Sequence, residues 1–96
     1  MARDRYIVAY DISDDKRRTR VSKRLESFGD RVQYSVFTCD LNDRERIDLS
    51  TSLETLINQR EDQVIFVSLG PADGNAPQRV LALGRKLELP TRARIV

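Results

Sequence analysis

The sequence predicts an α+β fold of the ferredoxin-like type, in which two helices cover one face of an antiparallel or mixed sheet. Residues 6–10 and 63–69 are short, nearly unbroken apolar runs, which are typical of buried strands. Two segments with helical periodicity lie between them, on either side of a further strand-like stretch. The 96 residues contain no repeat and no linker-like stretch, so we expect a single domain over residues 1–96.

The first helix is expected to follow the strand at residues 6–10. Val21, Leu25 and Phe28 lie at i, i+4 and i+7 and form a narrow apolar stripe. Ser13 is the predicted N-cap, and the two aspartates after it suit the positive end of the helix dipole. Gly29 is predicted to end the helix in a left-handed conformation.

Residues 31–39 are strand-like in composition and form either one bent strand or two short strands. Asn42 or Asp43 then caps a second helix. Four apolar residues of that helix follow helical spacing: Leu49, Leu53, Leu56 and Ile57. The pattern does not choose between the alternatives at residues 31–39 or between the two caps.

The C-terminal part contains a turn-rich loop at residues 70–77. Residues 79–84 are interpreted as a short strand or a helical turn. Pro90 separates a last apolar segment, residues 93–96, which is predicted to form an extra edge strand.

Two helices can cover only one face of the sheet. The strands at residues 6–10 and 64–67 are nevertheless apolar on both faces, so something else must cover the second face. A second copy of the same sheet is the simplest cover. The sequence therefore predicts a homodimer that packs sheet to sheet, with Asp11 repeated across its twofold axis.

Composition narrows the class of protein. The net charge is +2, but residues 1–35 carry +3, residues 36–76 carry −5 and residues 77–96 carry +4. Two basic blocks fit a surface for nucleic-acid phosphates, or else ordinary solvated helix faces. No apolar stretch is long enough for a membrane span, and no signal peptide is recognisable. The single cysteine excludes an internal disulfide. We therefore expect a cytoplasmic protein without membrane contact.

The absence of histidine excludes histidine-based acid–base catalysis and Ser-His-Asp triads. There is no glycine-rich phosphate loop and no cysteine cluster for zinc, and Cys39 is expected in the core. The remaining chemistry is that of oxygen ligands around a hard cation. Asp11, with Asp14 and Asp15 nearby, could hold magnesium, which needs only one or two carboxylates. Alternatively, these aspartates only cap the helix.

Four arginines are candidate phosphate contacts on the helix and strand surfaces: Arg17, Arg18, Arg20 and Arg31. The alternative is that they form salt bridges and keep the surface soluble. Tyr10, Tyr34 and Phe37 are expected in the core or in an interface, because the aromatic signature of an RNA-binding sheet of the RRM type is absent.

Two stretches of this sequence resemble a known family. Residues 10–18 read Tyr-Asp-Ile-Ser-Asp-Asp-Lys-Arg-Arg, and residues 28–37 read Phe-Gly-Asp-Arg-Val-Gln-Tyr-Ser-Val-Phe. In order and spacing they are similar to the CRISPR-associated Cas-two family, in which a strand ends in Tyr-Asp-Ile, a basic helix follows, and Gly-x-Arg-Val-Gln-x-Ser-Val-Phe comes next.

The resemblance implies a ferredoxin-like homodimer whose C-terminal strand packs on the partner's sheet. It implies a role in spacer acquisition, where the dimer binds duplex DNA and bridges dimers of the CRISPR integrase. It also implies magnesium-dependent endonuclease activity on single-stranded RNA or double-stranded DNA, with manganese as an alternative ion. The metal-binding, catalytic aspartate of the family falls on Asp11, and further family positions fall on Arg17, Arg31, Ser35 and Phe37.

Two other functions fit the same fold. One is a toxin ribonuclease of the VapD kind, which could use the same aspartate. The other is a regulatory ferredoxin-like dimer that binds a small molecule and has no catalytic activity. The sequence leaves open whether the chain cleaves nucleic acid and whether RNA or DNA is preferred.

Overall fold

The computed structural model describes residues 2–89 of the chain. Its sheet has the strand order β2-β3-β1-β4, and all neighbouring strands are antiparallel. This is the ferredoxin-like arrangement, so the predicted fold class is confirmed. In chain order the elements are β1 (Asp4–Asp11), α1 (Asp15–Glu26), β2 (Gly29–Gln33), β3 (Val36–Leu41), α2 (Asp43–Leu56), β4 (Gln63–Pro71) and the 3-10 helix η1 (Ala76–Arg79).

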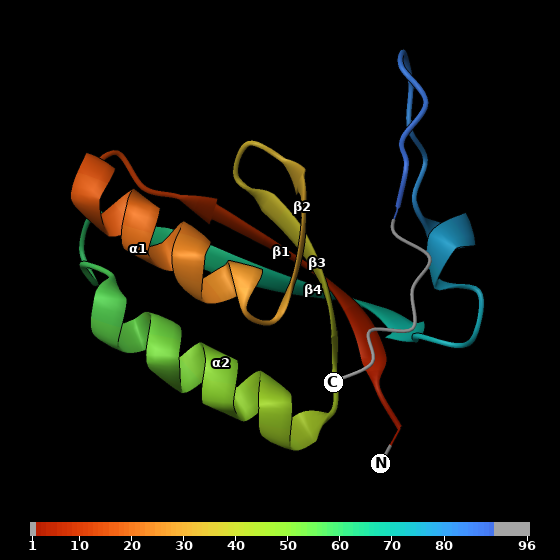
Figure 1. Ribbon diagram of the computed structural model, residues 1–96, viewed down its shortest axis with the longest axis horizontal. Helices are drawn as coiled ribbons and strands as arrows, with labels where there is room; N and C mark the ends of the chain where they lie inside the picture. Colours follow the sequence, from red (N-terminus) through yellow and green to blue (C-terminus); the bar gives the residue numbers. More distant parts are fainter. Residues whose placement is uncertain (1, 90–96) are drawn as a thin grey trace.

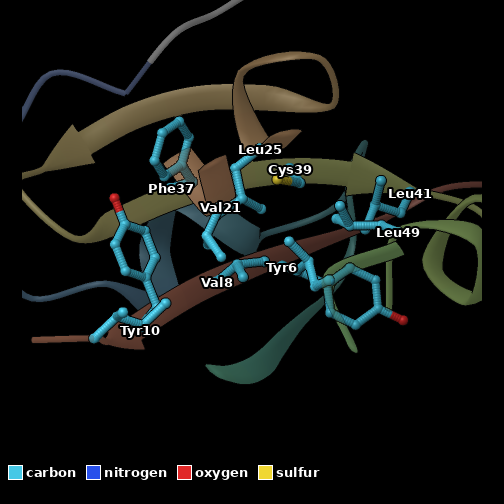
Figure 2. Close-up of a cluster of buried hydrophobic side chains, with 11 residues drawn as sticks. Tyr6, Val8, Tyr10, Val21, Leu25, Phe37, Cys39, Leu41 and Leu49 are labelled. Carbon is cyan, nitrogen blue, oxygen red and sulfur yellow. The ribbon is translucent and has the colours of Figure 1, made fainter. Parts of the chain in front are cut away.

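The two helices lie side by side on one face of the sheet (Figure 1). The core lies between these two layers, and every second residue of β1 contributes to it because side chains alternate across a strand. Figure 2 shows how Val8 and Phe37 of the sheet lie beside Val21 and Leu25 of α1. Each of these four side chains is fully buried. Neither helix is long and apolar enough to cross a membrane within residues 2–89.

The helix starts are set by side-chain caps. The N-cap of α1 is Asp14, whose carboxylate accepts a hydrogen bond from the Arg17 backbone amide at 2.9 Å. The prediction of Ser13 was therefore wrong by one residue, because Asp14 keeps an extended backbone and the helix begins after it. At α2 the cap is Asn42, which forms a reciprocal capping box with Glu45.

Gly29 does not end α1, and this prediction was also wrong. The helix ends at Ser27 in an ordinary right-handed conformation, and the chain enters β2 directly. Gly29 does not have a positive φ angle. It lies so close to β3 that an added Cβ would be 2.2 Å from the carbonyl oxygen of Thr38 and 2.6 Å from Cys39 Sγ. Close strand contact, rather than backbone freedom, requires glycine here.

Residues 31–39 form two strands, β2 and β3, which settles the alternative left open by the sequence. Tyr34 and Ser35 make the turn between them. Tyr34 does not lie in the core, because 73% of it is exposed. Tyr10 and Phe37 are buried, as expected, with ring centroids 6.3 Å apart.

The helical turn near the C-terminus lies earlier than predicted. It spans Ala76–Arg79 because Pro77 favours a helix start, whereas residues 80–83 have no regular secondary structure. The predicted edge strand at residues 93–96 lies outside the described residues.

Candidate functional site

The sheet has one face that the helices leave open. Ile7, Ala9 and Asp11 of β1 point to this face, since they alternate with buried core residues. Opposite them in register, Val67 pairs with Ile7 and Ile65 pairs with Ala9. These two β4 side chains are 45% and 46% exposed, respectively. The sequence predicted that β1 and β4 are apolar on both faces and that the helices cover only one of them. Both expectations are confirmed for the single chain.

Asp11 is the last residue of β1, where the open apolar face ends. Its register partner in β4 is Gln63, and it is exposed to solvent. The carboxylate thus lies at the rim of an apolar surface.

Asp14 and Asp15 do not join Asp11 in a cluster. Asp14 caps α1, and Asp15 forms an ion pair with Arg18. Within residues 2–89 no group of three or more acidic or cysteine side chains is arranged to hold a metal ion. Within the described residues, a single chain therefore does not bring three such ligands together around Asp11.

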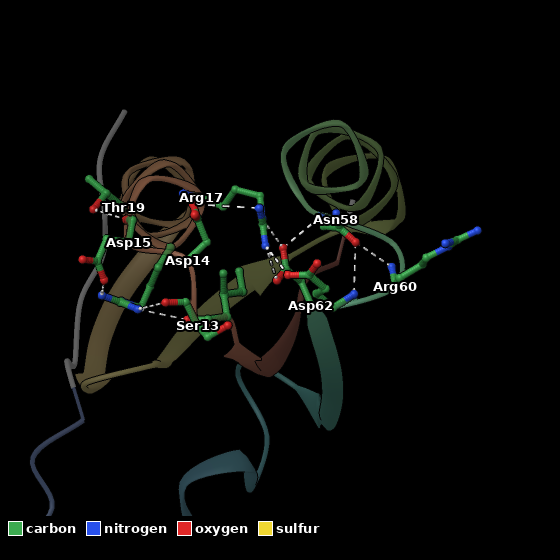
Figure 3. A network of polar contacts seen from close by, with 11 residues as sticks. Ser13, Asp14, Asp15, Arg17, Thr19, Asn58, Arg60 and Asp62 are labelled. Atoms are coloured by element: carbon green, nitrogen blue, oxygen red, sulfur yellow. Dashed lines mark hydrogen bonds and ion pairs between the residues drawn. The ribbon is translucent and has the colours of Figure 1, made fainter.

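Arg17 connects α1 to the loop between α2 and β4. Its guanidinium donates hydrogen bonds of 2.7 and 3.1 Å to the Asp62 carboxylate, which is fully buried (Figure 3). The backbone amide of Asn58 also donates to Asp62, at 2.8 Å. The Arg17 hydrogen bond, and the smaller contribution from Asn58, lower the pKa of Asp62 despite desolvation. The predicted phosphate contact Arg17 is thus committed to an ion pair.

Arg18 is held at the start of α1. It donates hydrogen bonds to the carbonyl oxygens of Ile12 at 3.0 Å and Ser13 at 3.1 Å, in addition to its ion pair with Asp15. Its guanidinium carbon lies 5.9 Å from the centroid of the Tyr34 ring, within the range of cation–π attraction.

Arg31 is held from the sheet side. Its guanidinium donates to Ser22 Oγ of α1 and to the Tyr34 carbonyl oxygen, and it lies 4.9 Å from the centroid of the Phe37 ring. Arg20, in contrast, is exposed on α1 and makes no ion pair with any other residue in the described part of the chain. Within residues 2–89, Arg17 and Arg18 make ion pairs, whereas Arg20 and Arg31 make none, and Arg31 donates only to neutral oxygens.

The two remaining predicted positions lie beside this region. Ser35 is half-buried in the β2–β3 turn, where its carbonyl oxygen accepts a hydrogen bond from the Tyr10 amide at 3.1 Å. Phe37 is fully buried in the core. Phe37 thus contributes to the packing of the core.

A groove that the sequence interpretation missed lies between α1 and the β2–β3 turn. Its volume is about 280 Å³. Arg18, Ser22 and Glu26 recur every four residues on one face of α1, which is the signal that could have identified the helix wall. The groove is lined by Tyr10, Arg18, Thr19, Ser22, Lys23, Glu26, Arg31 and Tyr34.

Known proteins are similar to this chain in sequence. The family model for CRISPR associated protein Cas2 matches residues 4–75. A protein of Rhodospirillum rubrum named CRISPR-associated endoribonuclease Cas2 1 is 40% identical over 91 residues, which are 95% of this chain and 88% of the relative. A protein of Geobacter sulfurreducens with the name CRISPR-associated endoribonuclease Cas2 is 33% identical over 95% of both chains.

Solved structures are also similar to this chain in fold. The crystal structure of Streptococcus pyogenes Cas2 superposes with a TM-score of 0.73 at 33% identity and covers 83% of this chain and 99% of that one. A chain of a partial Cas6-RT-Cas1–Cas2 complex superposes with a TM-score of 0.69 at 26% identity, covering 83% of this chain and 90% of that one.

Proposed function

This chain belongs to the CRISPR-associated protein Cas2 family, as the two sequence motifs indicated, and from that premise we propose that it is a subunit of the CRISPR adaptation machinery. In this role it binds duplex DNA as a homodimer, bridges the integrase and carries a magnesium-dependent endonuclease site at Asp11. The observation that carries the proposal is the position of Asp11, at the rim of an uncovered apolar sheet face in a member of this family.

The open face supports the dimer. Ile65 and Val67 expose nearly half of their surface although they lie in the interior of a strand. Burial of such a face against a second copy removes apolar area from water, which is the main favourable contribution to association. A twofold axis through this face repeats each rim residue, so each dimer has two Asp11 carboxylates.

The proposed metal ligands are these two carboxylates. Magnesium retains several waters and needs only one or two carboxylates, so a site with one aspartate from each chain fits its requirements. Manganese takes similar oxygen ligands. Magnesium bound there would neutralise negative charge on a phosphodiester and lower the pKa of water. Asp11 contributes the charge that holds the ion and is exposed, so that substrate can reach it.

Duplex binding is assigned to the basic surface of α1 and the neighbouring turn. Arg20 is exposed and makes no ion pair with another described residue, so it can contact a phosphate. Arg18 and Arg31 present positive charge on another side of α1, at the groove, because residues two positions apart do not share a helix face. Arg17 contributes little to this surface, because Asp62 neutralises its charge and Glu61 and Asp14 lie close to it. The complex that includes Cas1 and Cas2 among the similar structures supports the integrase as a partner.

Cleavage of labelled RNA and duplex DNA in magnesium tests the catalytic part of the proposal. Asp11→Ala and Asp11→Asn are expected to lose cleavage, whereas Asp73→Asn, which removes an exposed carboxylate from a loop, keeps it. The thermal shift that magnesium produces in the parent should also disappear in Asp11→Asn. Cleavage by Asp11→Asn at the parent's rate would refute the catalytic site and leave the scaffold role standing.

Two measurements test the scaffold. Light scattering is expected to find a dimer in the parent and a monomer in the double variant Ile65→Lys/Val67→Lys, whose lysines make the open face repel its copy. A pull-down with the cognate integrase is expected to recover a complex. A parent that is monomeric at micromolar concentration would refute the shared site, and a failed pull-down would refute the bridging role.

The tests also distinguish this role from two other functions, a toxin ribonuclease and a regulatory dimer without catalysis. Family membership favours the adaptation subunit over a toxin ribonuclease, and the position of the gene beside a CRISPR array would support the same choice. A regulatory dimer without catalysis predicts weak duplex binding with little salt dependence. Steep salt dependence favours the nucleic-acid role, because phosphate contacts release counterions.

A further inference from the structure

The groove between α1 and the β2–β3 turn contains an exposed aromatic ring in a basic setting. Tyr34 is 73% exposed, although a tyrosine ring loses favourable free energy when it stays in water. A side-chain hydrogen bond and a cation–π contact with Arg18 hold the ring at the surface, so burial in the core does not explain its position. The guanidinium carbon of Arg18 lies 5.9 Å from the centroid of the Tyr34 ring, and most of the residue is exposed to solvent.

The walls of the groove are held rigidly. Arg18 is bonded to two backbone carbonyl oxygens, and Arg31 bridges Ser22 of α1 to the Tyr34 carbonyl oxygen. The Tyr10 hydroxyl donates a hydrogen bond to the same carbonyl oxygen at 3.4 Å. The turn that carries Tyr34 is therefore fixed relative to the helix, and a ligand would meet a prepared surface, which reduces the entropic cost of binding.

Charge in the groove favours an anion. The lining includes three cationic side chains, Arg18, Lys23 and Arg31, against one carboxylate, Glu26. Asp15 neutralises part of the Arg18 charge. Lys23 is exposed and makes no ion pair with another described residue, so its ammonium group can move to a phosphate.

From these observations we infer that the groove binds one unpaired nucleotide of a nucleic-acid strand, with its base stacked on Tyr34 and its phosphate at Lys23. An aromatic platform in a positive groove is the combination by which proteins hold single strands without reading their sequence. A volume of about 280 Å³ suits a single nucleotide rather than a duplex. This inference rests on the proposed nucleic-acid role and adds a single-strand subsite to it.

The test compares two fluorescent probes, a short single-stranded oligothymidine and a blunt duplex, measured by anisotropy at fixed salt. Tyr34→Ala is expected to weaken binding of the oligothymidine roughly fivefold to 150-fold, the value of one base–aromatic stack, and to leave duplex binding nearly unchanged. Tyr34→Phe keeps the ring and should bind like the parent. Ile47→Ala, which truncates an exposed side chain on α2, is the control and should change neither affinity.

Lys23 gives an independent readout. Lys23→Ala should flatten the dependence of log Kd on log salt for the oligothymidine by about 0.7, the contribution of one phosphate contact on a single strand. Arg44→Ala removes the same charge from α2 and should leave the slope unchanged. Circular dichroism melting of each variant establishes that it is folded.

The outcomes separate the subsite from the proposed function. If the parent binds the duplex but Tyr34→Ala holds the oligothymidine as tightly as the parent, the subsite is refuted and the duplex role stands. If the oligothymidine binds through Tyr34 but the duplex does not bind, the subsite stands and the duplex role is refuted. A parent that binds neither probe refutes both.

Discussion

Replacing Gly29 by alanine is expected to destabilise the protein strongly, and the reason is the contact between β2 and β3. The new Cβ would lie 2.2 Å from the Thr38 carbonyl oxygen, so the two strands would have to separate by about 0.8 Å to bring that distance to 3.0 Å. The carbonyl belongs to the backbone and cannot rotate away. Cys39 Sγ, at 2.6 Å, blocks the adjacent direction.

The magnitude follows from the cost of overpacking. Inserting a methyl group into a well-packed site costs about 1–3 kcal/mol, and a backbone contact this short belongs at the upper end, about 3 kcal/mol. Total stabilities of small domains are about 5–15 kcal/mol. For a chain of this length, the loss corresponds to a decrease in Tm of roughly 12–24 °C.

Thermal unfolding followed by circular dichroism measures this change, with protein concentration held constant because association raises Tm. Gly70→Ala is the matched control, since Gly70 has a φ of 84° and nothing within 4 Å of an added Cβ. There the only cost is the left-handed backbone, about 1–2 kcal/mol.

Gly29→Asn distinguishes the two explanations for this glycine. A left-handed helix cap would tolerate asparagine better than alanine. Close contact with β3 predicts the opposite order, because asparagine is larger. The reasoning would be refuted if Gly29→Asn melted at or above Gly29→Ala, or if Gly29→Ala cost no more than Gly70→Ala.

The remaining predictions concern the core, a cap and an ion pair. Phe37→Ala should lower the free energy of unfolding in urea by about 3–5 kcal/mol, and Phe37→Leu should lower it much less. If Phe37→Leu retains nuclease activity, the role of Phe37 is packing. Asn42→Ala should cost about 0.5–2 kcal/mol because the capping box of α2 is lost, and an unchanged urea midpoint would contradict that geometry. The lowered pKa of Asp62 means that its stabilising effect is present above the ordinary aspartate pKa of about 3.9 and is lost as the pH falls below it. Asp62→Asn should therefore have a lower Tm than the parent at neutral pH, and its Tm should fall less than the parent's when the solution is acidified. Parallel curves of Tm against pH for the two proteins would contradict the ion pair.

The sequence by itself determined the fold class, most of the regular elements and the family. Apolar runs, helical periodicity and the β-sheet alternation are local patterns, and each is set by residues a few positions apart. Because these patterns are local, the sequence also located Asp11 at the end of a strand and indicated that the helices leave one face of the sheet uncovered. The two motifs that identify the family are also contiguous stretches.

Only the tertiary structure decided what the individual polar and glycine residues do. Arg17 was predicted to contact phosphate, but its partner Asp62 lies 45 positions away and no local pattern pairs them. The contact that requires Gly29 comes from the backbone of β3, and the groove at Tyr34 exists because a turn of the sheet packs beside α1. These roles depend on distances between segments that are remote in sequence, which periodicity does not encode.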